Sequence, residues 1–118
     1  MTSLADVIEI CEGLAGSEID HLAEQFSVGV PVKGKVKGYA WTWLERFHPK
    51  KARIPNREVL AIRVANLEVK AAILAEAQPY WVDDDHYNSY PAVIVRLPLI
   101  KRSALAELLQ AGYNCWVK

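Results

Sequence analysis

Basic residues gather around one predicted hairpin, and this is the first pattern in the sequence that could do chemistry. Two strand-like stretches, residues 36–47 and 57–64, flank a loop that contains Pro49 and Pro55. The loop and the start of its second strand carry four cations: Lys50, Lys51, Arg53 and Arg57. Clustered cations neutralise the phosphates of nucleic acids, so we predict a phosphate-binding clamp here. The alternative is an ordinary solvated loop.

A second basic set lies just upstream, where Lys33, Lys35 and Lys37 alternate along the chain. Alternate residues of an extended segment point to the same face, so these lysines would extend the phosphate-binding track. Lysines on strand edges also prevent edge-to-edge aggregation, which is the competing interpretation. Residues 31–63 hold nine Lys and Arg against two Glu, whereas residues 1–30 hold six acids and no Lys or Arg. The net charge of zero therefore conceals a basic middle segment.

Aromatic residues alternate in the first strand of the hairpin. Tyr39, Trp41 and Trp43 would share one face, where they could stack on the bases of single-stranded nucleic acid. The opposite face offers only small or polar partners for packing, namely Ala40, Thr42 and Leu44. Because aromatic side chains dominate burial energetics, we expect the aromatic face to be the core face.

A polar segment near residue 85 is the second candidate site. Three aspartates at residues 83–85 precede His86, and carboxylates with imidazole suit divalent cations. The spacing lacks the glycine and the distal glutamate of a calcium-binding loop, so we predict a polar turn without metal. His86, Tyr87 and Tyr90 could instead line a pocket for a small ligand or a protein segment. This is the alternative to nucleic-acid binding.

Catalytic patterns are missing from the sequence. The three histidines, His21, His48 and His86, fall in unrelated segments, and no nucleophile motif or phosphate-binding glycine-rich loop accompanies them. Cys11 and Cys115 lack the spacing of zinc ligands, and we predict that both are free thiols. We therefore expect neither enzymatic activity nor a cofactor.

The elements that must position these residues follow from periodicity and capping. Ser3 can cap a helix whose apolar residues recur at helical spacing up to Leu14, with acidic residues left for solvent. Residues 18–25 fit either a helix or a strand. The other predicted elements are strands at 26–32, 36–47 and 57–64, a helix at 67–77 after Asn66, short strands at 80–82 and 92–97, and a helix after Pro98. This alternation is typical of the α+β class, with helices laid over an antiparallel sheet in the order α-β3-α-β2-α.

Three segments of the chain resemble the MmcQ/YjbR family. They are VGVPVKGK at residues 28–35, VLAIRV at residues 59–64 and DHYNSYPAVIVRL at residues 85–97. The resemblance covers roughly residues 4–112 and implies an α-β3-α-β2-α domain related in shape to secretion chaperones and frataxin. It also implies DNA binding through a double-wing motif. The acidic residues of the first helix are similar to the iron-holding helix of frataxin-like proteins, although a solvated helix face is the simpler interpretation.

Size and composition set the remaining expectations. A chain of 118 residues with 52% apolar and 24% charged residues is typical of one globular domain, so we predict a single domain over residues 1–118. No stretch is apolar for long enough to span a membrane, and the start lacks the pattern of a signal peptide. We expect a cytoplasmic monomer whose partners are DNA, bound weakly, or another protein, and not a membrane.

Overall fold

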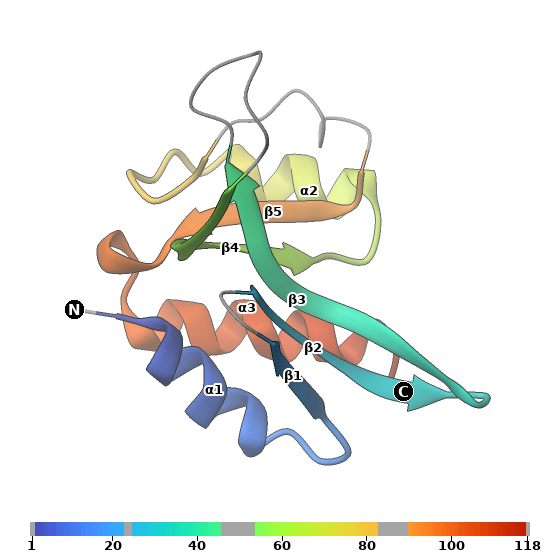
Figure 1. Cartoon of the computed structure of the whole chain (residues 1–118). Coiled ribbons are helices and arrows are strands. Elements are labelled where there is room, and N and C mark those ends of the chain that lie inside the picture. Colours follow the sequence, from blue (N-terminus) through green and yellow to red (C-terminus); the bar gives the residue numbers. More distant parts are fainter. Residues whose placement is uncertain (1, 23–24, 46–53, 83–89, 118) are drawn as a thin grey trace.

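A five-stranded antiparallel sheet with helices against it forms the body of the protein (Figure 1). The computed structural model describes residues 2–22, 25–45, 54–82 and 90–117. The strands are β1 (Glu18–Leu22), β2 (Gln25–Val32), β3 (Lys35–Glu45), β4 (Ile54–Arg63) and β5 (Ala92–Arg96). They lie in the sheet in chain order. The helices are α1 (Leu4–Glu12), α2 (Leu67–Leu74), the short 3-10 helix η2 (Leu97–Leu99) and α3 (Arg102–Asn114).

The predicted α+β class is confirmed, but the strands divide differently between the two halves of the chain. The ambiguous segment after residue 17 forms β1, because exposed Glu18 and Asp20 alternate with Ile19, which packs on the core. The predicted strand at residues 80–82 makes only an isolated bridge between Trp81 and Val95. Within the described ranges, four strands therefore precede α2 and one follows it, in place of the expected three and two.

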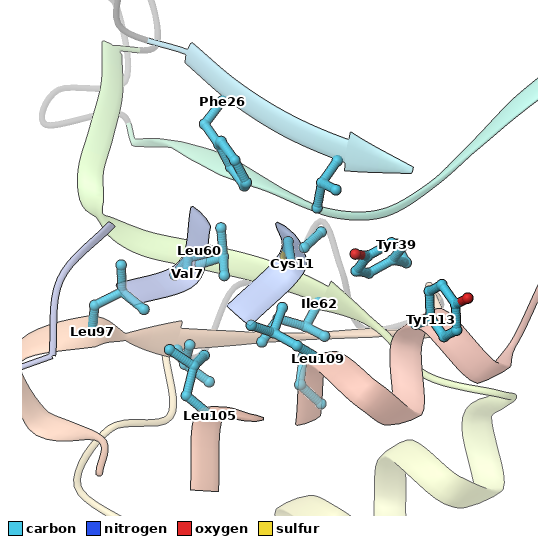
Figure 2. Close-up of a cluster of buried hydrophobic side chains, with 14 of the residues drawn as sticks. Val7, Cys11, Phe26, Tyr39, Leu60, Ile62, Leu97, Leu105, Leu109 and Tyr113 are labelled. Atoms are coloured by element: carbon cyan, nitrogen blue, oxygen red, sulfur yellow. The ribbon is translucent and has the colours of Figure 1, made fainter. Parts of the chain in front are cut away.

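Helices α1 and α3 cover one face of the sheet. Ser3 caps α1 as predicted, and its backbone N–H donates to the Asp6 carboxylate over 2.8 Å. Val7 and Cys11 of α1 meet Leu105 and Leu109 of α3 in the main core (Figure 2). The sheet supplies the opposite side of this core through alternate residues of its central strands, including Val28, Leu60, Ile62, Val93 and Val95.

The other face of the sheet carries a smaller cluster. Val59, Ala61 and Ile94 are buried there, and Trp41 and Val82 pack partly buried against them. Helix α2 lies beside β5 (Figure 1), and the Asn66 side chain caps it by accepting a hydrogen bond from Val69 N–H over 2.8 Å. The buried cluster on the face covered by α1 and α3 is thus the larger of the two.

The expectation that Tyr39, Trp41 and Trp43 share one face is wrong for the first two. A bulge in the β2–β3 ladder leaves Tyr39 between the pairs Gly29↔Gly38 and Val28↔Ala40. The extra residue turns Tyr39 toward the main core, where it is fully buried beside Ala40, while Trp41 lies in the cluster on the opposite face. The side chain of Trp43 lies outside the described residues.

Glycine permits two close backbone contacts near this bulge. A Cβ at Gly29 would lie 2.5 Å from the carbonyl oxygen of Lys37, which no side chain could tolerate without a backbone shift. A Cβ at Gly112 of α3 would lie 3.1 Å from the carbonyl of Arg63 and 3.2 Å from that of Tyr39. The end of α3 is therefore seated directly on the backbone of β3 and β4.

The helices of the described ranges are too short or too polar to cross a membrane.

Candidate nucleic-acid interface

The turn between β2 and β3 presents the first group of lysines. Val32 pairs with Lys35, and the two residues between them have positive φ angles, 52° at Lys33 and 85° at Gly34. Positive φ at both central positions defines the type I′ turn that fits the twist of a β-hairpin. The hairpin extends beyond the rest of the sheet (Figure 1), and the side chains of Lys33 and Lys35 are exposed at its end.

Lys35 and Lys37 lie on the face of the sheet that α3 covers. Lys35 pairs with Val32 and Lys37 with Val30, and both valines pack in or against the main core. Cross-strand partners share a face, so both lysines project from the face that carries the main core. Lys37 is half-buried there, whereas Lys35 is exposed.

Trp116, just beyond α3, holds two cations at the base of this hairpin. Its indole N–H donates to the carbonyl of Gly38 over 3.1 Å, which fixes the ring against β3. The Lys37 ammonium lies 5.7 Å from the ring centroid, and the guanidinium carbon of Arg63 lies 4.7 Å from it. Both distances are within the range of cation–π attraction.

Arg63 is the functional candidate that sequence reasoning missed. It is the last residue of β4, and the four residues before it, Val59–Ile62, are all buried. A charge that ends so apolar a run was the available signal, because a buried strand rarely carries an arginine without a role. The Nε atom of Arg63 is buried and has no hydrogen-bond partner.

The cations at this end of the molecule contrast with Arg102 at the start of α3. Arg102 pairs with Asp6 over 2.5 Å and with Glu9 over 2.8 Å, both on α1. The pKa of Asp6 is lowered, first by the Ser3 backbone N–H and then by Arg102, and the pKa of Arg102 is raised, chiefly by Glu9. Across the described ranges no ion pair involves the members of the hairpin group, Lys33, Lys35, Lys37 and Arg63.

The other predicted basic residues follow β3 in the sequence. Lys50, Lys51 and Arg53 lie outside the described residues, in the segment that joins Glu45 to Ile54, and the side chain of Arg57 in β4 is likewise not described. Strand β3 has 11 residues, which at about 3.3 Å per residue separates its ends by roughly 33 Å. The seven predicted residues therefore divide along the chain into a set at the start of β3 and a set that follows its end.

Of the three residues predicted to line a pocket, only Tyr90 is among those that the structure describes. Its ring is 42% exposed and meets Trp41 edge to face at a centroid distance of 6.1 Å, and its carbonyl accepts a hydrogen bond from Lys70 Nζ over 2.9 Å. His86, Tyr87 and the aspartates at residues 83–85 lie outside the described residues. Elsewhere in the described chain, no three His, Cys, Asp or Glu side chains are grouped as metal ligands would be.

Burial raises the pKa of three side chains, Cys11, Tyr39 and Cys115. Cys11 is fully buried, and burial raises the pKa of its thiol. Burial also raises the pKa of Tyr39 well above its usual range, while its hydroxyl hydrogen-bonds that of Ser17 over 2.8 Å. Cys115 is a free thiol like Cys11, and its pKa is raised by burial although the charge of Arg63 opposes that rise.

Comparison with known proteins establishes the fold. No model of a known protein family matches the sequence. Uncharacterized proteins of Mycobacterium bovis and Mycobacterium tuberculosis are 34% identical over 59 residues, which is 50% of this chain. The chain spans 46% of the length of these curated relatives.

A crystal structure from Deinococcus radiodurans, of a protein with a DUF419 domain, matches 96% of this chain and 77% of its own. The TM-score is 0.64 and the sequence identity is 21%. The two proteins share a fold. DUF419 is the YjbR/MmcQ-like family, which is the family that the three sequence segments resemble.

Proposed function

We propose that the chain is an MmcQ/YjbR-type domain that binds DNA weakly and without sequence specificity, through contacts to phosphates. The observation that carries the proposal is the hairpin group: four cations at one end of the sheet, with no ion pair to a carboxylate in the described ranges. The fold shared with a DUF419 protein is consistent with it, because the resemblance to the MmcQ/YjbR family implies a double-wing domain that binds DNA.

The chemistry of the hairpin group favours backbone contacts over base recognition. Bases are distinguished in the major groove by side chains that pair with their edges, most often from an inserted helix. Helix α3 instead buries Leu105 and Leu109 against the sheet, and the exposed hairpin turn carries lysines, which bind phosphates as point charges. Affinity should then fall steeply with salt and vary little with sequence.

The residues at the other end of β3 enter the proposal as a second contact. Lys50, Lys51 and Arg53 belong to the connection after β3, which starts about 33 Å from the hairpin turn, and Arg57 follows in β4. Along one DNA strand that distance corresponds to about ten phosphates at ~3.4 Å each. A duplex lying along β3 could touch both groups, as the two wings of such a domain would require.

A titration of the purified protein with a labelled mixed-sequence duplex tests the proposal. If three or four phosphates are neutralised, the affinity should fall about 40- to 150-fold between roughly 50 and 200 mM salt, since the log–log slope is about −0.9 per contact. The Lys33/Lys35/Lys37→Gln variant should bind more weakly and show a shallower slope. The Lys50/Lys51/Arg53→Gln variant measures the second contact separately. Absence of binding at the lower salt would contradict the proposal.

A protein- or small-ligand-binding module is the second candidate. The aromatic pair Trp41 and Tyr90 carries this alternative, because Tyr90 is exposed on the sheet face opposite the main core. Helix α2 contacts this region through Lys70, which donates to the Tyr90 carbonyl, and Leu67 and Leu74 of the same helix are 47% and 39% exposed. A ligand bound there would change the fluorescence of Trp41 with little dependence on salt, whereas a phosphate-driven complex would depend on it strongly.

A further inference from the structure

We infer that Arg63 and Lys37, arranged around Trp116, form a binding site for one phosphate group. The ligand is a phosphate group, which either a DNA backbone or free phosphate could supply. That the phosphate comes from DNA rests on the proposed function. In contrast to a diffuse basic surface, this site has one anchoring contact, Arg63. Trp116 orients that arginine.

The parts of this site are held in place by backbone contacts. Arg63 ends β4, and the close seat of Gly112 on its carbonyl fixes that end of the strand against α3. Trp116 is fixed by the hydrogen bond from its indole N–H to the carbonyl of Gly38, which is the neighbour of Lys37 in β3. The two cations and the indole ring are thus held by three separate segments of the chain: β3, β4 and the residues just after α3.

The guanidinium of Arg63 has the free donors that a phosphate needs. Its carbon lies 4.7 Å from the Trp116 ring centroid, a contact that leaves the N–H edge of the guanidinium available for in-plane hydrogen bonds. Its Nε atom is buried and has no hydrogen-bond partner in the described chain. Packing has therefore removed a hydrogen bond to water without supplying another acceptor. An anion bound to the two terminal nitrogens would offset the lost hydration through its charge.

The charge of the site favours a dianion. Lys37 adds a second positive charge on the same indole ring, 5.7 Å from its centroid. Neither cation forms an ion pair within the part of the chain that the structure describes, whereas Arg102 has two. A phosphate dianion matches a site with two positive charges better than a single carboxylate does, and an arginine can bind it through two parallel hydrogen bonds.

The test follows the indole N–H resonance of Trp116 by NMR, assigned with a Trp116→Phe variant, during titration with inorganic phosphate against chloride at equal ionic strength. The wild type should show a saturable shift with phosphate only. Arg63→Lys keeps the charge but loses the planar donors, so its affinity should fall by about fivefold or more. Arg102→Lys makes the same change at the other end of α3 and should leave the affinity unchanged. Equal affinities of the two variants, or no saturable shift, would overturn the site.

A second titration with a DNA duplex separates the site from the proposed function. A shift of the same resonance by the duplex, reversed by excess phosphate, supports a backbone phosphate as the ligand. Phosphate binding without duplex binding at low salt would contradict the proposed function and leave the phosphate site standing. Duplex binding without any effect of phosphate on Trp116 would overturn the site and leave the proposed function standing. The spectrum of each variant also reports whether it is folded.

Discussion

The two ends of helix α3 each meet an arginine, and the two arginines differ in their surroundings. At its start, Arg102 binds the carboxylates of Asp6 and Glu9 and joins α3 to α1. Just beyond its end, Arg63 lies against the ring of Trp116 with no carboxylate partner and with one nitrogen buried and unsatisfied. Both residues are cations of one chemical type. The first is neutralised by the fold, and the second remains electrostatically open to a ligand.

This difference shows why total charge is a poor guide to the function of a neutral protein. The acidic first helix is compensated locally at Asp6 and Glu9, by an arginine from the C-terminal part of the chain. The basic hairpin consequently keeps its own charge although the net charge of the chain is zero. A local surface potential, and not the isoelectric point, governs whether a polyanion is attracted.

The largest effect that we predict is a loss of stability when the close packing near Arg63 is disturbed. Replacing Gly29 by Ala would place a Cβ 2.5 Å from the Lys37 carbonyl, and overpacking of this kind costs about 1–3 kcal/mol of unfolding free energy. Its cross-strand partner Gly38 is the matched control, since a Cβ there would meet only the Val28 carbonyl at 3.9 Å. Urea denaturation of both variants measures the difference. Equal stabilities would mean that the bulge is not tightly packed.

An alkaline titration probes the core beneath this end. The pKa of Tyr39 is raised by burial, so above the ordinary tyrosine pKa of 10.0 the unfolded chain loses a proton that the folded protein keeps. Stability from this residue is therefore complete below that pH and declines as the pH rises through it. We expect the wild type to lose unfolding free energy more steeply than Tyr39→Phe in urea denaturation at increasing pH. Parallel curves would contradict the burial of the hydroxyl.

At the Arg102 end of α3 we expect a smaller change in stability, which is lost in acid and not in alkali. Because the pKa of Asp6 is lowered in the folded protein, its contribution to stability is present above the ordinary carboxyl pKa of 3.8 and is lost as the pH falls through the lowered value. Asp6→Asn should be slightly less stable than the wild type at neutral pH. The gap should close in acid, as thermal unfolding at a series of pH values would show. A gap that persists in acid would argue against the pairing.

The sequence predicted those elements whose pattern is local. Ser3 and Asn66 were recognised as caps because capping depends on residues three apart, and the central strands showed plain alternation. The face of Tyr39 could not be predicted, since the bulge that turns it depends on the cross-strand contact at Gly29. Strand β1 was ambiguous for a related reason, because its pairing with β2 decides its conformation.

The candidate site was predictable only in part. Lys33, Lys35 and Lys37 were visible as an alternating set in one segment. The contacts of Lys37 and Arg63 with Trp116 join residues up to 79 positions apart, and they arise where the end of α3 packs on the sheet. Nothing in the local pattern around Trp116 indicates that contact.

The most direct test of the account compares the two arginines in DNA binding. Arg63→Gln and Arg102→Gln remove the same charge from opposite ends of α3, so any difference between them reflects position alone. We predict that Arg63→Gln weakens binding of a mixed-sequence duplex and reduces the magnitude of the salt slope by about one, as expected for one lost phosphate contact. Arg102→Gln should bind like the wild type. Equal losses in the two variants would mean that net charge alone drives binding, and would contradict a built phosphate contact at Arg63.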